Sequence, residues 1–240
     1  MCNLYNISTT HEMMRQLARA VIDLTNRANP SEDIYPDRMA PIVRNSPDGR
    51  ELVYTRWGMP SSKKALFDAA TKRADKLRAK GKDVDFDALL KMEPDGGTTN
   101  IRNTSSQHWR RWFGIENRCV VPFTRFAEPD PASKREGGRT PNAWFAIDEG
   151  QPLAFFAGLW VPQWESVRKV KEGLIKADLY AFLTCEPNAV VKPIHPKAMP
   201  VILTSEEEIE TWLTAPWPEA QRLQRPLPDY RLILLPAEVE

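Results

Sequence analysis

The residue with the clearest chemical potential is Cys2, which directly follows the initiator methionine. A small, thiol-bearing second residue allows a methionine aminopeptidase to remove Met1, and Cys2 then carries an amine and a thiol on adjacent carbons. An α-amine titrates near about pH 8 and a cysteine thiol near about pH 8.5, so both nucleophiles are partly available at neutral pH. Such a 1,2-aminothiol traps aldehydes, because the amine forms an imine and the thiolate then closes a thiazolidine ring. A second-position cysteine also occurs without any chemical role, so this interpretation needs partner residues.

Two residues have the chemistry of proton donors or acceptors. Glu128 follows an apolar segment and precedes a proline, so it is expected at a strand end, where partial desolvation would raise its pKa toward useful acid/base values. His195 precedes a proline, which favours an extended backbone, and imidazole titrates near neutrality. An exposed surface glutamate and a hydrogen-bonded strand-end histidine remain the simpler explanations of both positions.

Two further residues could bind a ligand from one strand. Asn100 and Arg102 are separated by one apolar residue, so in an extended segment their side chains point to the same side. Arginine offers a bidentate donor pair to phosphate, and an asparagine amide both donates and accepts hydrogen bonds. The pair is therefore a candidate site for an anionic ligand.

The elements that must position these residues are mostly short strands. Segments of β-prone residues recur from residues 3–7 to residues 230–235, with turn residues between them, a pattern typical of an antiparallel sheet curled toward a barrel. Capping boxes at Thr9 and Ser205 predict peripheral helices, the first of which continues through Val21 to Leu24 by apolar spacing. We therefore expect an α+β fold with one domain over residues 1–240, in which a curled, mostly antiparallel, barrel-like sheet carries peripheral helices.

Two segments lie outside this core pattern. Residues 61–97 combine apolar residues at helical spacing with many lysines and interleaved aspartates, and predict a helical insertion with a solvated face. Residues 214–240 are rich in proline and predict a wrap around the core. Trp57 falls at the end of a strand beside a glycine, where the tip could present the indole to solvent. Trp109 falls in a short helix in which Arg110 and Arg111 separate it from Trp112. Exposed indoles among basic residues can stack on bases, although a helix buried by its tryptophans explains Trp109 better.

Composition excludes several classes of protein. The net charge is +1, which argues against bulk electrostatic binding of long duplex DNA but says nothing about a local basic groove. The three cysteines are widely spaced and the three histidines form no metal motif, so we expect reduced thiols, no metal and no cofactor. No apolar segment is long enough to span a bilayer, and no signal peptide is evident, so we expect a cytoplasmic protein without membrane contact.

The ordered motifs resemble the SRAP family, named for SOS response-associated peptidases. The resemblance covers residues 1–205 and is carried by Met1-Cys2, Arg56-Trp57-Gly58, Asn100-Ile101-Arg102, Arg118-Cys119 with Pro122, Phe126-Ala127-Glu128, and His195 before Met199-Pro200. It implies a β-rich domain that shields abasic sites in single-stranded DNA and needs no cofactor, and with it a nucleoid-associated monomer. It also implies the following roles: Cys2 as covalent nucleophile, Asn100 orienting the adduct, Glu128 moving protons, His195 assisting imine formation and ring opening, and Arg56, Trp57 and Arg102 contacting DNA.

Four departures from the family pattern affect mainly the expected DNA contacts. Asn3 and Leu4 replace a glycine and an arginine, so one phosphate-binding arginine is lost, and Thr104 replaces a glutamate. The gap between His195 and Met199 is one residue longer than usual, and the segment 61–97 is extra. These changes indicate a divergent bacterial subgroup that keeps the catalytic positions.

Three functions remain open from the sequence. The first is an abasic-site processing protein with autopeptidase or lyase-type activity, in which Cys2 crosslinks to an open-chain deoxyribose aldehyde. The second is a cysteine peptidase or N-terminal nucleophile amidohydrolase, with Glu128 and His195 as acid and base. The third is a non-covalent single-stranded DNA-binding module that uses Trp57, Trp109 and basic residues.

Overall fold

A closed ring of five strands forms the centre of the structure. The computed structural model describes residues 2–25 and 33–237. Antiparallel pairing follows the order β11-β10-β7-β4-β5, and β11 then pairs with β5 in parallel, which closes the ring into a barrel. Full closure leaves no exposed edge in the ring. The five strands are β4 (Met39–Ser46), β5 (Gly49–Trp57), β7 (Arg118–Phe123), β10 (Ala154–Val167) and β11 (Leu174–Cys185).

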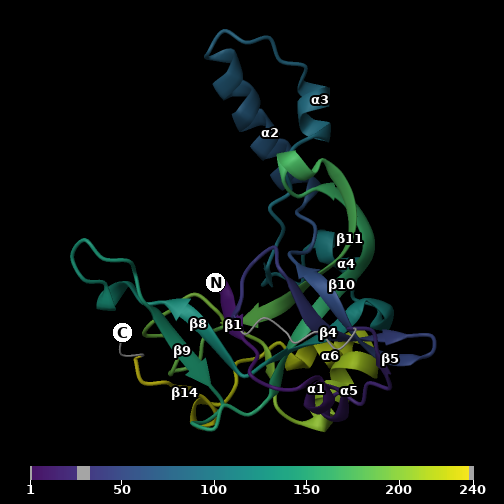
Figure 1. The fold of residues 1–240 in the computed structure, drawn as a ribbon, viewed down its shortest axis with the longest axis vertical. Coiled ribbons are helices and arrows are strands. Elements are labelled where there is room, and N and C mark those ends of the chain that lie inside the picture. The colour runs from purple at the N-terminus through teal and green to yellow at the C-terminus, as the bar shows by residue number, and fades with distance from the viewer. Residues whose placement is uncertain (1, 26–32, 238–240) are drawn as a thin grey trace.

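A second sheet of five strands packs beside this barrel and carries the N-terminus (Figure 1). Its order is β14-β9-β8-β1-β3, so β1 lies between two partners. The bounds are β1 (Leu4–Asn6), β3 (Asp33–Ile34), β8 (Arg125–Pro129), β9 (Asn142–Ala146) and β14 (Ile233–Leu234). The chain passes from the barrel to this sheet at buried Thr124, whose amide donates to the Asn6 carbonyl at 2.8 Å. The expected α+β fold with a barrel-like, curled sheet is therefore confirmed.

Short strands extend the barrel at its rim. They are β2 (Ile22–Asp23), β6 (Asn100–Ile101), β12 (Met199–Pro200) and β13 (Ile202–Leu203). β6 pairs with β11 in parallel, with Asn100 opposite Phe182. The expected strand pattern is thus present, although β10 and β11 are much longer than their apolar segments indicate.

Aromatic residues from both sheets share one core. Phe123 and Phe156 stack inside the barrel with ring centroids 3.9 Å apart. Tyr5, from β1 of the second sheet, meets Phe156 edge-to-face at 5.7 Å. Such edge-to-face contacts contribute about 0.5–1.5 kcal/mol beyond the apolar area that they bury. The contact therefore fixes β1 against the barrel as well as against its own sheet.

The first helix, α1 (His11–Leu17), is shorter than its apolar spacing predicts. Thr10, rather than Thr9, caps it, with its side chain accepting from the Met13 amide. The helix ends because Arg19 takes a left-handed backbone with φ of 52°. The expected continuation to Val21 and Leu24 is therefore wrong, and the Val21 amide instead donates to the Arg50 carbonyl beside β2.

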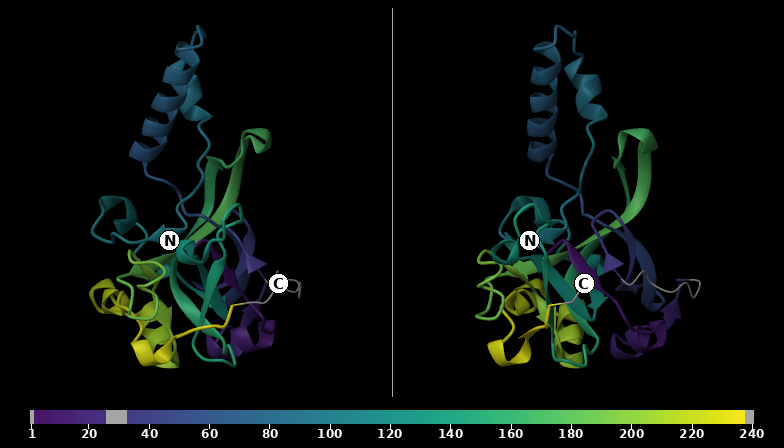
Figure 2. Two further views of the ribbon diagram at one scale, coloured as in Figure 1. Left: turned by 90° about the vertical axis from the view of Figure 1, so that its left-hand side faces the viewer. Right: turned by 60° about the vertical axis from the view of Figure 1, so that its left-hand side comes forward.

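Two helices between residues 61 and 92 form a hairpin, which we call the helical arm (residues 61–92). They are α2 (Lys63–Arg78) and α3 (Phe86–Lys91), and both lie in the segment 61–97, where the sequence predicts a helical insertion. The arm projects away from the barrel in every view (Figures 1 and 2), next to the arched outer part of β10 and β11. It is joined to the barrel by the two chain segments at its base.

Helices α5 and α6 lie on the side of the barrel away from the helical arm (Figure 1). Ser205 caps α5 by accepting from the Glu208 amide, as expected, and buried Trp212 of α5 donates to the Cys119 carbonyl of β7 at 2.9 Å. None of the helices in the described segments is long and apolar enough to cross a membrane. The bounds are α4 (Gln107–Arg110), α5 (Glu206–Thr214), α6 (Trp217–Ala220), η1 (Ile115–Asn117), η2 (Pro131–Ser133), η3 (Val170–Glu172), η4 (Gln221–Leu223) and η5 (Asp229–Arg231).

Barrel closure depends on the absence of a side chain at Gly158 in the middle of β10. A Cβ there would lie 2.7 Å from Cys119 Sγ and 3.3 Å from the Ala181 carbonyl oxygen. We expect Gly158→Ala to destabilise the protein by about 1–3 kcal/mol through overpacking, measured by urea unfolding. Gly96→Ala is the control, since no atom lies within 4 Å of its Cβ position. Equal unfolding midpoints for the two variants would contradict this account.

Candidate active site

Cys2 lies buried at the start of β1, where the second sheet meets the barrel. Its side chain is 1% exposed, and its Sγ donates to the Leu4 carbonyl at 3.4 Å. Leu4 pairs with Ala127 of β8, and the strand is also bonded on its other side to β3. Met1, whose removal the chemistry needs, lies outside the described residues. The strand that directly follows Cys2 is therefore held by hydrogen bonds to a neighbouring strand on each side.

Asn100 contacts Cys2 directly. It lies on β6 and is 6% exposed, and its Nδ2 donates to the Cys2 carbonyl at 2.9 Å and to Thr99 Oγ1 at 2.8 Å. Its Oδ1 is buried without a hydrogen-bond partner among the described residues. A buried amide oxygen without a donor is costly, so this atom is available to a donor that arrives with a ligand.

Glu128 and His195 complete the cluster. Glu128 is fully buried on β8, and burial raises the pKa of its carboxyl, which the nearby charge of His195 only partly offsets. Burial raises the pKa of the Cys2 thiol well above its usual range, and the Glu128 carboxylate raises it further. His195 lies in the loop before β12, where its Nδ1 lies 2.8 Å from the Ala198 carbonyl oxygen. The four residues expected to act together are therefore neighbours.

The structure does not present Trp57 to solvent. Its side chain is fully buried, its Nε1 donates to the Thr99 carbonyl at 3.1 Å, and its ring stacks on Phe182 at 5.3 Å. The expectation of an exposed indole at the strand tip is wrong, because the parallel pairing of β5 with β11 continues to Trp57 and encloses it. Trp57 therefore bonds the residue directly before β6, and its buried ring offers no face on which a base could stack.

The two expected arginines differ in what they bind. Arg56 donates two 2.7 Å hydrogen bonds to Asp37 and is also paired with Glu172, so carboxylates already occupy its guanidinium. Arg102 pairs with Glu186 through Nη2, whereas its buried Nη1 has no hydrogen-bond partner in the part of the chain described. Arg102 therefore keeps a donor for a ligand, and Arg56 does not.

Comparison with known proteins identifies the family. The family model described as SOS response associated peptidase (SRAP) matches residues 1–239. This chain belongs to the SRAP family. Membership confirms the resemblance of the ordered motifs and associates the chain with the response to DNA damage.

Solved structures share this SRAP fold. A protein from Bordetella bronchiseptica is 25% identical with a TM-score of 0.63, and the match covers 100% of both chains. A protein from Bacteroides thetaiotaomicron is 18% identical with a TM-score of 0.64, covering 97% of this chain and 90% of that one. A phage-related protein from Bordetella bronchiseptica is 16% identical with a TM-score of 0.65, covering 100% and 95%. No curated protein matches the sequence.

Three polar residues near the Cys2 cluster had no assigned role from the sequence. Tyr5 and Tyr180 are both fully buried below Cys2, and their hydroxyls share a 2.5 Å hydrogen bond between β1 and β11. Gln224, in the C-terminal wrap, donates to the carbonyls of Arg102 at 2.9 Å and Thr184 at 3.0 Å, and accepts from Thr104. These partners are distant in sequence, so only the fold brings them together. Thr104, at the position of the family's glutamate, thus helps to hold β6.

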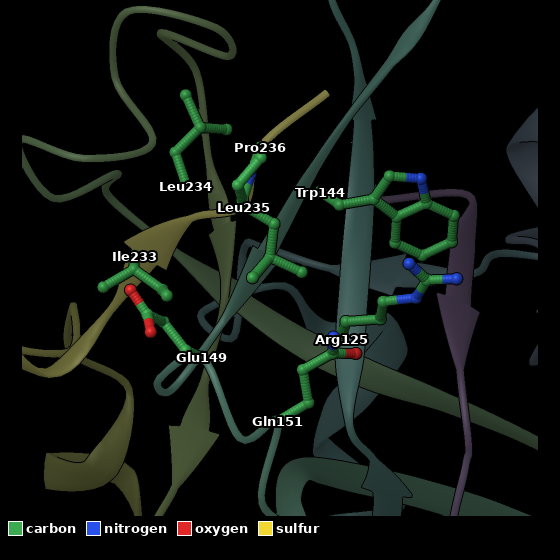
Figure 3. A pocket seen from close by; sticks show the side chains of 8 residues that line it. All are labelled: Arg125, Trp144, Glu149, Gln151, Ile233, Leu234, Leu235 and Pro236. Carbon is green, nitrogen blue, oxygen red and sulfur yellow. The ribbon is translucent and has the colours of Figure 1, made fainter. Parts of the chain in front are cut away.

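A hollow on the outer face of the second sheet is separate from this site. Arg125 lies over the ring of Trp144 at 4.2 Å, and C-terminal residues 233–236 form the opposite wall (Figure 3). Arg125 and Glu128 are three residues apart on β8, so they point to opposite faces of the sheet. The hollow therefore does not open on the Cys2 cluster. Within the described residues, no group of three or more acidic, histidine or cysteine side chains could hold a metal ion.

The effect of Glu128 on the Cys2 thiol is measurable by alkylation. We expect Glu128→Gln to speed carboxymethylation of Cys2 at mildly alkaline pH by roughly tenfold, since loss of a nearby negative charge lowers a thiol pKa by about one unit or more. Peptide mapping by mass spectrometry reports Cys2 separately from fully buried Cys119, whose rate should not change. The exposed Glu136→Gln is the matched control. An equal rate in both variants would show that the Glu128 charge does not reach the thiol.

Proposed function

We propose that this SRAP protein captures abasic sites in single-stranded DNA as a covalent thiazolidine on Cys2, after Met1 has been removed. The observation that carries the proposal is the buried cluster in which Asn100 bonds the Cys2 carbonyl while Glu128 and His195 lie within electrostatic reach. The ring-opened form of an abasic deoxyribose has an aldehyde. The missing base also leaves room for the sugar to approach a recessed nucleophile without base flipping.

The chemistry balances with the loss of one water molecule. The Cys2 amine adds to the aldehyde carbon to give a carbinolamine, and its hydroxyl leaves as water after taking a proton. The resulting imine carbon then accepts the Cys2 sulfur, and the thiol proton passes to the nitrogen. A C–N and a C–S bond have formed, the C=O bond has been lost, and no oxidant or reductant is required.

The surrounding residues fit the steps of this reaction. Because burial raises the pKa of Glu128, this residue keeps a proton that it can give to the leaving hydroxyl. The same raised pKa lets the carboxylate take the thiol proton when the ring closes. Asn100 holds the Cys2 carbonyl through Nδ2 and offers Oδ1 to the amine or carbinolamine hydrogen. His195, beside Glu128, is placed to exchange protons between this carboxyl and solvent.

Arg102 is the residue best placed to hold the DNA backbone. Its buried Nη1 has no protein partner among the described residues, and it lies two residues from Asn100 on the segment that contacts Cys2. A guanidinium binds phosphate with favourable geometry. Since Leu4 replaces the family's arginine, Arg102 carries more of this contact than in other members.

The geometry offers less to the two other functions. A cysteine peptidase needs a thiol that readily gives the thiolate, whereas burial raises the pKa of the Cys2 thiol well above its usual range. A stacking module needs exposed aromatic faces, whereas Trp57 is fully buried and Trp109 is 7% exposed. Aldehyde capture through the amine requires neither of these features.

The proposal is tested by incubating the protein with a uracil-containing single strand treated with uracil glycosylase. We expect a heat-stable adduct without reductant, and its loss in Cys2→Ala, which keeps an α-amine but lacks the thiol. Borohydride should still trap an imine in Cys2→Ala. Asn100→Ala should slow adduct formation by roughly tenfold, the effect of losing about 1.4 kcal/mol of positioning.

Intact mass confirms that Met1 is absent from the protein used. An equal heat-stable adduct in Cys2→Ala, or no adduct with the Met1-free wild type, would refute the thiazolidine. Release of a new peptide by a Cys2-dependent reaction would instead favour the peptidase.

The pH profile tests the acid role of Glu128. Burial raises the pKa of the Glu128 carboxyl, which holds its proton below that pKa and loses it as the pH rises through it. The wild-type rate of adduct formation should therefore fall as the pH rises through the pKa of Glu128. Glu128→Gln should be slower by on the order of a hundredfold and lack this fall. The exposed Glu136→Gln should keep the wild-type profile. An unchanged pH dependence in Glu128→Gln would remove Glu128 from the mechanism.

A further inference from the structure

The base of the helical arm is anchored to the barrel by a network of bonds. Met59 and Thr98 pair as an antiparallel bridge, with amide-to-carbonyl distances of 3.0 and 2.7 Å. Arg168, on the arched hairpin of β10 and β11, is buried there, donates to the Gly58 carbonyl at 3.1 Å and pairs with Asp37. Burial would raise the pKa of Asp37, but its ion pairs with Arg56, Lys169 and Arg168 outweigh this and hold the pKa well below its usual range. The arm therefore leaves the barrel in a defined direction.

This anchor is continuous with the active site. The bridge residue Thr98 lies two positions before Asn100, and the intervening Thr99 accepts from both Trp57 Nε1 and Asn100 Nδ2. The arm rises from the same side of the molecule as the N-terminal end (Figure 1). Its position relative to Cys2 is thus set by the strand that also positions the catalytic amide.

The arm carries a positive charge that the rest of the chain does not. Residues 61–92 contain nine lysines and arginines against five aspartates, a net charge of +4, whereas the whole chain is +1 and the remainder is therefore −3. Three of the basic residues are neutralised by ion pairs with Asp68, Asp75 and Glu93. Among described residues, exposed lysines without an ion pair remain at Lys63, Lys72, Lys76, Lys80, Lys82 and Lys91.

The arm offers charge but no base-reading surface. Lys72 and Lys76 are one helical turn apart and project from one face of α2, and Lys80 and Lys82 continue toward the tip. The arm contains no tyrosine or tryptophan, and its Phe67 and Phe86 meet edge-to-face at 5.3 Å between the helices. Lysines alone bind phosphates without reading sequence. The ligand that this surface fits is therefore a nucleic-acid backbone.

We propose that the helical arm binds the phosphate backbone of duplex DNA that flanks the abasic single strand. The 16 residues of α2 span about 24 Å in a fixed direction. A DNA duplex is stiff over about 150 base pairs. A duplex that leaves the site therefore keeps one direction and can run beside the arm. A flexible single strand has no such fixed direction. This inference rests on the proposed function for the position of the DNA, and it assigns this protein to junctions between single and double strands.

The test measures reversible binding with an abasic analogue that lacks the aldehyde, tetrahydrofuran, so that covalent capture does not interfere. Two probes are used: a short single strand, and the same strand extended by a duplex. We expect Lys72→Gln, Lys76→Gln and Lys80→Gln together to weaken junction binding by roughly tenfold and to lower the salt slope of log Kd by about 2–3. Binding of the short single strand, and its Cys2-dependent crosslinking in the aldehyde form, should stay at the wild-type level.

A matched variant removes the same charge elsewhere. Lys134→Gln, Arg135→Gln and Arg139→Gln neutralise three exposed residues on the loop between β8 and β9 and should leave junction binding unchanged. Helix content by circular dichroism checks that the arm remains folded. Wild-type junction affinity in the arm variant, equal losses for both probes, or equal losses in both triple variants would each overturn the proposal. Failure of the proposed function is distinct, since it removes the Cys2-dependent crosslink from the wild type.

Discussion

The structure depends on the parallel pairing of β11 with β5 and β6. The other neighbouring strands of the barrel pair in antiparallel orientation. The parallel pairing of β11 with β5 closes the ring and sets the register of its strands. Leu179 lies opposite Arg56, Tyr180 opposite Trp57, and Phe182 opposite Asn100. One strand therefore encloses Trp57, places the Tyr180 hydroxyl against Tyr5, and brings Asn100 to the Cys2 carbonyl. Without closure, the Asn100 amide would not reach the Cys2 carbonyl.

Closure also places the reactive groups where water does not solvate them. Burial raises the pKa of both Cys2 and Glu128, so each favours its neutral form. A neutral thiol and a neutral acid suit imine chemistry, in which the amine attacks first and protons must be supplied. The same burial would be a disadvantage for an enzyme that needs a resting thiolate. The raised pKa values of the Cys2 thiol and the Glu128 carboxyl thus follow from one feature, the depth at which both side chains are buried, and they suit the aldehyde substrate that we propose.

Sequence patterns predicted the fold class better than the site. The β-prone segments, the Ser205 cap and the helices of residues 63–91 were all predicted by local patterns, because local propensity and tertiary packing agree there. The end of α1 was not, since a single left-handed residue, Arg19, overrides an apolar spacing that continues to Leu24. Trp57 was placed on the surface because a strand end beside glycine gives no sign of a parallel partner more than a hundred residues later. The grouping of Cys2 with Asn100, Glu128 and His195 came from the family resemblance, because spacing alone cannot show that distant residues meet.

The double pairing of β1 has a consequence for the reactive end of the chain. Chain termini normally fray, but this one is part of a sheet, bonded to β8 on one side and to β3 on the other. The loss of backbone entropy that an ordered nucleophile requires is therefore incurred once, when the domain folds, and not again with each substrate. Main-chain hydrogen bonds order the strand directly after Cys2, and the Asn100 side chain holds the Cys2 carbonyl. Under the function that we propose, a residue retained in front of Cys2 would leave this ordered segment without a free amine.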